Sequence, residues 1–324
     1  HRCVQLGIPC LTSLDTANAL TDILASRYNQ TNTELIDICH LRETRQELSF
    51  AKMQSCGNDY IMLENFDGEI TCPESLCVTF CDRHYGIGAD GIVLMEKSKK
   101  ADARMRMFNR DGSEGQMAGN ALRCMGKYLY DNGIVNKESV TIETETGVKT
   151  VHLYTMNGKV TSATVSMGYA TLDIAALNIN IPEKQVVDYP VQIGGKDYSI
   201  TCVDMGNPHC VVFCPRVDAV DVPHIGPQFE QAPYFPERIN TEFIRVVNQS
   251  TIKMRVWERG SGETMACGSG ACAAVVAAVA NNLCEKGRDI TVKVRGGDLV
   301  VNYTDKEVTL TGDAKLVYEG VVEY

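Results

Sequence analysis

Two short segments of this 324-residue chain repeat one residue pattern, and this repeat is the strongest constraint on its fold. The first, EGQMAGNALRC, covers residues 114–124, and the second, ETMACGSGAC, covers 263–272. Aligning Ala118 with Cys267 places a Glu four residues before each and a Gly directly after each. Each segment follows an apolar strand-like run and precedes an apolar helix-like run. We therefore predict two homologous halves whose equivalent turns face each other at a junction, where a site is expected.

The alternative is that two strand-turn-helix units converged on small residues for packing, and the shared Glu argues against it. Alternating strands and helices are predicted from Leu48 onwards. Helical periodicity covers 72–84, 119–132 (with Gly133 as its stop) and 268–284. Strands are predicted at 48–55, 60–66, 91–97, 104–109, 139–154, 159–168, 186–215, 241–257 and after the last helix.

Composition excludes several classes of function. The formal charge of −10 and the lack of a basic cluster argue against a nucleic-acid partner. No apolar run is long enough to cross a bilayer, and no signal peptide is visible. The 14 Cys include no CxxC pair, which argues against a structural zinc site and favours a reducing cytoplasm in which most cysteines are buried packing residues.

Cys267 is predicted to lie at the N-terminus of the second helix. Unpaired backbone N–H groups and the helix dipole stabilise a thiolate there and lower the thiol pKa. The glycines that follow leave amides free to hold a carboxylate. This arrangement suits removal or return of the proton on an amino acid's α-carbon. Inverting that carbon needs a second acid or base on the other face, so the pattern demands a cysteine at Ala118.

Residues 48–324 resemble the diaminopimelate epimerase family, whose members are cofactor-independent enzymes of lysine and cell-wall biosynthesis. The resemblance rests on six ordered blocks: GNDY at 57–60, RHYGIGADG at 83–91, FNRDGSE at 108–114, GNPHCVVF at 206–213, PERINTEF at 236–243 and WERGSGETMACGSGACAA at 257–274.

The resemblance implies an α/β fold of two pseudo-symmetric domains, each a β-barrel-like sheet around a central helix, with the active site in the cleft between them. The first domain would span 48–166 together with 314–324, and the second would span 167–313. No metal or cofactor is implied. The expected partner is a small amino-acid substrate, with a homodimer left open.

The resemblance also implies the roles of site residues. Cys267 corresponds to one catalytic cysteine, and Ala118 occupies the place of the other. Gly119, Asn120, Gly268 and Ser269 would hold the reacting carboxylate. Glu258 would bind an ammonium group and Arg259 a carboxylate, which suits a zwitterion. His209 would lie beside the thiol pair, and further polar contacts are implied for Asn58, Asn109, Asn207 and Asn240.

Taken singly, several of these residues have structural explanations. Asn58 and Asn207 follow Gly and suit left-handed turn positions. His209 alone is typical of a core or turn histidine, and the pair at 258–259 is typical of a solvated surface. Cys124 and Cys272 are predicted to be packing residues. The GIGADG segment at 86–91 lacks the flanking pattern of a nucleotide site.

Ala118 has three explanations: an introduced replacement that traps substrate, a natural pseudoenzyme, or a shifted pairing with another cysteine. The intact flanks favour the first, and we expect little or no epimerase activity.

Rival functions are racemisation of another amino acid such as histidine or proline, binding without catalysis, and a phenazine-type isomerisation, against which Cys267 argues. Residues 1–47 resemble the tail of the carbamoyl phosphate synthetase large subunit and are interpreted as an N-terminal extension or a fusion remnant. Within them, Ser13 or Asp15 is predicted to be the N-cap of a helix that runs to about Leu24.

Overall fold

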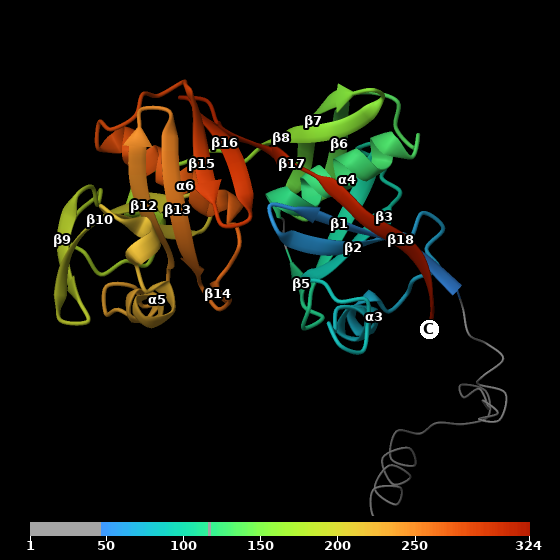
Figure 1. Cartoon of the computed structure of the whole chain (residues 1–324), viewed down its shortest axis with the longest axis horizontal. Helices are drawn as coiled ribbons and strands as arrows, with labels where there is room; N and C mark the ends of the chain where they lie inside the picture. Colours follow the sequence, from blue (N-terminus) through green and yellow to red (C-terminus); the bar gives the residue numbers. More distant parts are fainter. Residues whose placement is uncertain (1–46, 116–117) are drawn as a thin grey trace, which may run out of the picture. The chain divides into compact units, whose positions relative to one another are not determined.

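The computed structural model describes residues 47–115 and 118–324 (Figure 1). The chain divides into a first unit, His1–Leu48 with Val322–Tyr324, and a second unit, Ser49–Val321. The predicted helix near Leu24 and almost all of the predicted fusion remnant lie outside the described residues. The helices and strands between Ser49 and Val321 belong to the second unit. Within the described residues, no helix combines the length and apolarity needed to cross a membrane.

Eighteen described strands form one continuous sheet. They are β1 (Glu47–Ser55), β2 (Asn58–Glu64), β3 (Gly91–Glu96), β4 (Ala103–Asn109), β5 (Glu114–Gly115), β6 (Ser139–Thr144), β7 (Gly147–Met156), β8 (Lys159–Ser166), β9 (Tyr189–Ile193), β10 (Lys196–Asp204), β11 (Pro208–Phe213), β12 (Asn240–Asn248), β13 (Thr251–Glu258), β14 (Gly262–Glu263), β15 (Asp289–Val294), β16 (Gly297–Tyr303), β17 (Val308–Asp313) and β18 (Lys315–Glu323). The described helices are α3 (Pro73–Phe80), α4 (Gly119–Asp131), α5 (Val222–Glu230) and α6 (Gly268–Ala280), with short 3-10 turns at Ile174–Ala176 and Val217–Ala219.

The strand pairings of β1–β8 recur in the same order in β10–β17. β2 and β3 are parallel, as are β11 and β12. The antiparallel pairs β3–β4 and β4–β5 match β12–β13 and β13–β14. The parallel pair β4–β6 and the hairpin β6–β7 match β13–β15 and β15–β16. We call β1–β8 the first half and β10–β17 the second half. The pairings confirm the predicted fold class of two pseudo-symmetric halves.

The two halves are joined edge to edge. β8 pairs antiparallel with β17, with Ser166 opposite Thr309. β18 then returns to pair with β1 (Figure 1).

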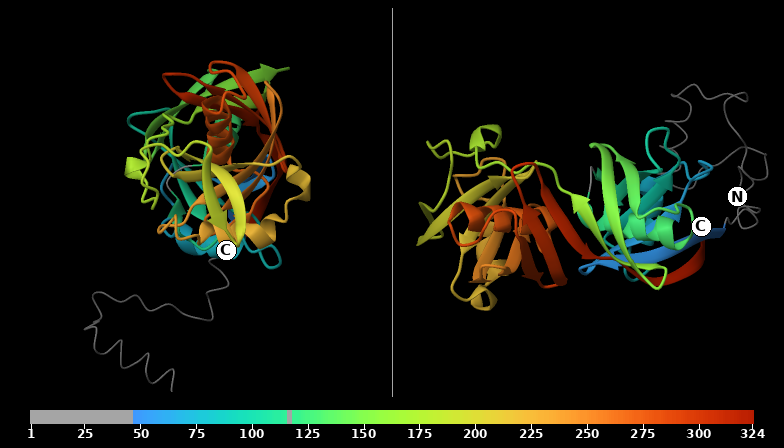
Figure 2. Two further views of the ribbon diagram at one scale, coloured as in Figure 1. Left: turned by 90° about the vertical axis from the view of Figure 1, so that its left-hand side faces the viewer. Right: turned by 90° about the horizontal axis from the view of Figure 1, so that it is seen from above.

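Each half encloses its own helix. α4 packs in a core that includes Met53, Met62 and Ile142, and α6 packs in a second core that includes Ile244, Met254 and Val301. Figure 2 shows α6 running inside the strands of its half. Nine of its residues are buried, because its Ala, Val, Gly and Cys residues present an apolar surface on all sides. A third core lies under α5.

Two helix predictions needed correction, and one helix was missed. The first helix ends at Phe80 instead of 84, because the Asp82 carboxylate accepts hydrogen bonds from the N–H groups of His84 and Tyr85 and closes a turn. α6 ends at Ala280 instead of 284, because Asn282 adopts a φ of 58°. α5 was not predicted, since its two prolines and one glycine resemble a loop.

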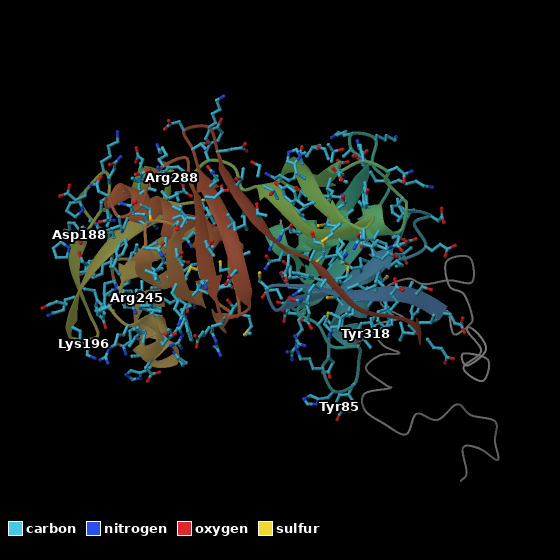
Figure 3. All side chains as sticks on the ribbon, turned by 45° about the horizontal axis from the view of Figure 1, so that its top comes forward. Tyr85, Asp188, Lys196, Arg245, Arg288 and Tyr318 are labelled. Carbon is cyan, nitrogen blue, oxygen red and sulfur yellow. The ribbon has the colours of Figure 1, made fainter. Side chains whose placement is uncertain are left out.

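Phe229 is the best place to test the third core. Its ring is fully buried on α5 and meets Tyr198 and Phe243 edge to face, at centroid distances of 4.9 and 5.4 Å. Phe229→Ala should lower the free energy of unfolding by about 3–5 kcal/mol, because it leaves a cavity among aromatic rings. Urea denaturation measures the loss. Tyr85→Ala, at a side chain that projects into solvent (Figure 3), is the control and should cost less than about 0.5 kcal/mol.

Candidate active site

The two repeated turns place Ala118 and Cys267 at equivalent positions, directly before the first residue of a helix. Both have extended backbones, with φ of −132° at Ala118 and −123° at Cys267. The sulfur of Cys267 accepts a hydrogen bond of 3.3 Å from the N–H of Gly270, so it acts as a helix cap. Ala118 provides no such acceptor.

The Glu that both turns share anchors them to the preceding strand. Glu114 accepts hydrogen bonds of 2.7 and 2.8 Å from Arg106, and Glu263 accepts one of 2.8 Å from Arg255. Arg106 and Arg255 occupy equivalent positions on β4 and β13. A pair of this kind holds the strand ends together because a guanidinium and a carboxylate match in shape. The repeated Glu is thus explained by anchoring of the turn.

Ala118 and Cys267 line one cavity of about 450 Å³. Nine of the residues predicted for the site line it: Asn58, Ala118, Gly119, Asn120, Asn207, Glu258, Cys267, Gly268 and Ser269. The structure therefore brings both helix starts and most predicted contacts to one place. The cavity is also lined by six residues that the sequence did not single out: Thr146, Lys149, Met167, Met205, Gly206 and Ala266.

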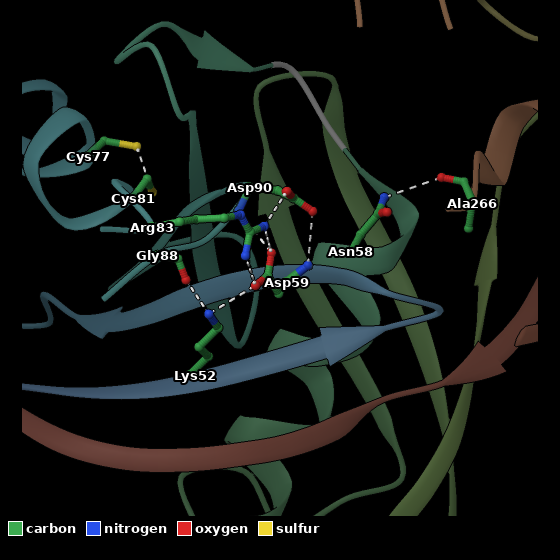
Figure 4. A network of polar contacts seen from close by, with 9 residues as sticks. All are labelled: Lys52, Asn58, Asp59, Cys77, Cys81, Arg83, Gly88, Asp90 and Ala266. Atoms are coloured by element: carbon green, nitrogen blue, oxygen red, sulfur yellow. Dashed lines mark hydrogen bonds and ion pairs between the residues drawn. The ribbon is translucent and has the colours of Figure 1, made fainter. Parts of the chain in front are cut away.

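Asn58 and Asn207 reach the cavity from equivalent turns. The preceding residues Gly57 and Gly206 have φ of 87° and 89°, so the glycines, and not the asparagines, take up the left-handed conformation. The amide of Asn58 donates 3.3 Å to the carbonyl of Ala266, directly before Cys267 (Figure 4). Asn58 begins β2 and Asn207 directly precedes β11, and both residues line the cavity.

An ion network supports the turn that carries Asn58 (Figure 4). Asp59 lies 3.0 Å from the ammonium of Lys52 and 2.8 Å from the guanidinium of Arg83, which also lies 2.9 Å from Asp90. Lys52 donates to the carbonyl of Gly88 as well. The GIGADG segment thus joins the start of β2 to the start of β3.

Four predicted residues do not line this cavity. The amide of Asn109 donates 3.0 Å to the Ser113 hydroxyl, and Asn240 is buried, where it donates to the carbonyl of Pro208 and accepts from the N–H of Arg259. Arg259 lines a neighbouring cavity of about 350 Å³, which shares Gly206 and Asn207 with the first. These contacts place Arg259 beside the site, with its backbone held by Asn240.

His209 is fully buried behind the cavity. Its Nε2 lies 3.0 Å from Oδ1 of Asn207, and its Nδ1 lies 2.8 Å from Oε1 of Glu242. His209 therefore reaches the site through Asn207. The sequence did not single out Glu242, because it looks like an ordinary residue of a strand.

The environment of Cys267 corrects the prediction that its pKa is lowered. Burial, followed by the charges of Glu258 and Glu242, raises the pKa of the Cys267 thiol well above its ordinary value. The hydrogen bonds from Ser269 and Gly270 act in the opposite direction and are outweighed. A raised pKa favours the neutral thiol over the thiolate, and a thiolate formed here is a stronger base than an ordinary one.

Glu258 lies in the cavity wall next to this sulfur. Burial raises the pKa of the Glu258 carboxyl, while a hydrogen bond from the Thr264 hydroxyl lowers it. Cys124 and Cys272 are fully buried inside α4 and α6, and burial raises the pKa of each to about 12. Both have the surroundings of packing residues. Among the residues that the structure describes, no group of His, Cys, Asp or Glu side chains is arranged to hold a metal ion.

Comparisons with known proteins agree with this geometry. The chain is 48% identical over 281 residues to a protein of Desulfovibrio desulfuricans named diaminopimelate epimerase, covering 84% of this chain and 97% of the relative. It is 46% identical over 278 residues to a protein of the same name from Acetivibrio thermocellus, covering 85% and 99%.

Solved structures show the same fold at low identity. A hydroxyproline epimerase from Agrobacterium vitis superposes with a TM-score of 0.63 at 13% identity, covering 86% of this chain and 92% of that one. A phenazine biosynthesis protein of the PhzF family from Bacillus anthracis gives 0.63 at 15%, covering 86% and 99%. The family model described as diaminopimelate epimerase matches residues 50–172 and 201–317. This chain belongs to the diaminopimelate epimerase family.

Proposed function

We propose that the chain is built as a cofactor-independent epimerase that interconverts LL- and meso-diaminopimelate, for lysine and peptidoglycan biosynthesis. We further propose that it is catalytically impaired because Ala118 stands where the second thiol is needed. The observation that carries the proposal is the shared cavity: two equivalent helix starts, at Ala118 and Cys267, line its wall together. The names of relatives at 46–48% identity support the substrate.

The proposed reaction needs one group on each face of the α-carbon. The N–H groups at the starts of α4 and α6 hold the reacting carboxylate, since helix N-termini favour anions. As a thiolate, Cys267 takes the α-proton, and the electron pair left on the carbon is delocalised into the carboxylate. As a thiol, it returns a proton to the same face. With a methyl group at Ala118, no proton reaches the other face and the configuration is kept.

The experiment that tests the proposal is deuterium uptake from heavy water into LL- and meso-diaminopimelate, followed by NMR. It is run on this chain and on Ala118→Cys. This chain should exchange the α-hydrogen of one isomer without inverting it, and Ala118→Cys should produce the other isomer. If neither protein exchanges hydrogen although both bind the ligand, the chain is a binding protein, which is the second candidate.

The neighbouring cavity suits the far end of the substrate. Arg259 donates 3.2 Å to the carbonyl of Glu237 there and retains further N–H donors for a carboxylate. Arg259→Gln should weaken binding of meso-diaminopimelate to this chain by about 10- to 100-fold, the expected effect of losing a hydrogen bond to a charged group. Isothermal titration calorimetry measures the change.

Arg288→Gln is the control, because Arg288 is a mostly exposed arginine that lies 2.5 Å from Glu285 and lines neither cavity. Its effect should stay below about threefold, as for other exposed ion pairs. Equal losses for the two variants would mean that Arg259 does not bind the substrate. Tighter binding of proline or histidine than of diaminopimelate would favour a racemase of another amino acid.

We also propose a cytoplasmic location and leave a homodimer as the candidate assembly. All eleven described cysteines are free thiols, which fits a reducing compartment. Strand β18 carries exposed apolar side chains at Leu316, Val317, Tyr318 and Val321, a surface of the kind found at interfaces (Figure 3 labels Tyr318). Sedimentation velocity over a series of protein concentrations tests the assembly.

A further inference from the structure

The two helix starts have opposite charges buried beneath them. Arg123 lies in α4 and Glu242 in β12, and both are fully buried. Of the described residues, four have a buried side-chain nitrogen or oxygen without a hydrogen-bond partner, and two of these atoms are Nη1 of Arg123 and Oε2 of Glu242. A buried charged group with an unpaired atom destabilises a fold. Two such groups, one under each helix start, call for an explanation in terms of the site.

Arg123 lies against the first turn of α4. Its Nη2 donates 2.8 Å to the hydroxyl of Ser55 and also donates to Oδ1 of Asn120, which lines the cavity. Its Nη1 would be 3.7 Å from a Cβ added to Gly119. The positive charge is therefore held close to the residues that follow Ala118.

Glu242 lies against the first turn of α6 in the same way. Its Oε1 would be 2.6 Å from a Cβ added to Gly270, and the sulfur of Cys267 would be 3.2 Å from the same point. A side chain larger than hydrogen would not fit at Gly270 without moving the carboxylate. His209 lies against Oε1 only, so the second oxygen keeps no partner.

Neither charge belongs to the internal repeat. The strand registers make Val93 the equivalent of Glu242, and the helix starts make Cys272 the equivalent of Arg123. Two further charges in the cavity wall are also not repeated. Lys149 in the first half corresponds to Leu299, and Glu258 in the second half corresponds to Asn109. The first half thus brings cations to the site and the second half brings carboxylates.

We propose that Arg123 and Glu242 are positioning residues that make the two faces of the cavity electrostatically unequal, favouring a thiolate at position 118 and a neutral thiol at Cys267. The inference rests on the proposed two-base site and goes beyond it, because it names the two buried charges that set the protonation state of each face. In the present chain, Ala118 stands in place of this thiolate, and the thiol at Cys267 remains.

Other titratable groups face the two positions. Glu258 and, through Glu242, His209 are near Cys267. Cys56, Tyr60, Cys124 and Asp313 surround Arg123, and the Asp313 carboxylate lies 2.9 Å from the ammonium of Lys315. The raised pKa of Cys267, which burial and then Glu258 and Glu242 produce, agrees with the proposal. Arg259 lines the neighbouring cavity instead.

Alkylation tests the proposal without any need for epimerase activity, because only the thiolate reacts. Ala118→Cys is kept reduced and treated with limiting iodoacetamide over a series of pH values, and mass spectrometry of the two helix peptides gives both rates. The introduced sulfur should reach half its maximal rate at least about one pH unit below Cys267. Glu242→Gln in that protein should shift the Cys267 midpoint down and raise its rate at neutral pH about tenfold.

Arg123→Met should shift the midpoint of the introduced sulfur up, and Arg123→Lys should bring it back. Glu230→Gln is the matched control, since Glu230 is a buried carboxylate of the second half that binds Trp257 at 2.6 Å and does not line the cavity. It should move neither midpoint. If Arg123→Met does not fold, as circular dichroism would show, the effect of Glu242→Gln on the Cys267 midpoint still tests the proposal.

Equal midpoints for the two sulfurs, or a Cys267 midpoint that Glu242→Gln leaves unchanged, would overturn the proposal. Failure of this proposal can be distinguished from failure of the proposed function. Unequal midpoints together with no epimerisation by Ala118→Cys would leave the charge asymmetry standing while the proposed reaction fails.

Discussion

Ala118→Cys should convert this chain into an active epimerase. A positioned acid or base contributes about 10²–10⁴-fold to a rate, so epimerisation should rise by at least about 10²-fold over the present chain. The physical reason is that Ala118 lines the same cavity as Cys267 and begins the equivalent helix, so a sulfur there meets the opposite face of the substrate. The measurement is the rate of formation of meso- from LL-diaminopimelate.

Ala118→Ser is the matched control for this gain. A hydroxyl is about the size of a thiol but ionises far less readily, so the serine variant should show less than about a hundredth of the cysteine variant's rate. A folded Ala118→Cys protein that binds diaminopimelate as tightly as the present chain, yet inverts none of it, would contradict the assignment of position 118.

Cys267→Ala in the present chain should abolish the remaining one-sided exchange of the α-hydrogen, a loss of at least about 10²-fold.

In the present chain, which retains Cys267, the exchange rate should rise about tenfold per pH unit near neutrality. The sign follows from the raised pKa of Cys267: below that pKa most sulfur is protonated, and each unit of pH multiplies the thiolate fraction about tenfold. NMR of the α-position in heavy water measures both effects.

Cys272→Ala is the control for the loss of exchange. Cys272 lies five residues further along α6 and is fully buried, so its removal should leave the exchange rate within about twofold. A Cys267→Ala protein that still exchanges at the parent rate would show that another group is the base. A flat pH profile would instead mean that the sulfur is already ionised at neutrality.

The fold could be predicted largely because its signal is periodic and repeated. The all-round apolar run after Cys267 predicted a buried central helix, and the matching turn at Ala118 predicted a second one. α5 was missed because its residues include Pro223, Gly226 and Pro227, whose local preferences oppose a helix. There Gly226 lies against the Trp257 ring, where a Cβ would be only 2.4 Å from the ring, so close tertiary packing outweighs propensity.

The lining of the candidate site was largely predictable from the sequence, whereas the buried charges behind that lining were not. The pattern around Cys267 indicated a helix start, and from it we predicted a lowered pKa. Only the fold reveals that Glu242, 25 residues earlier on another strand, lies against the same helix turn. Arg123 likewise looks like a solvated helix residue in the sequence but is fully buried. Burial and long-range charge are set by tertiary contacts, which local patterns do not encode.

The return of β18 to β1 has a consequence for how the protein is made. β1 is synthesised before all the other described strands and β18 after them. The edge of β1 that pairs with β18 therefore stays unpaired until β18 has been synthesised. β8 likewise waits for β17. During that interval the nascent chain exposes unpaired strand edges, which are prone to non-native pairing. Maturation of the first half is therefore tied to the synthesis of β17 and β18, and chaperones that shield such edges should increase the yield of folded protein.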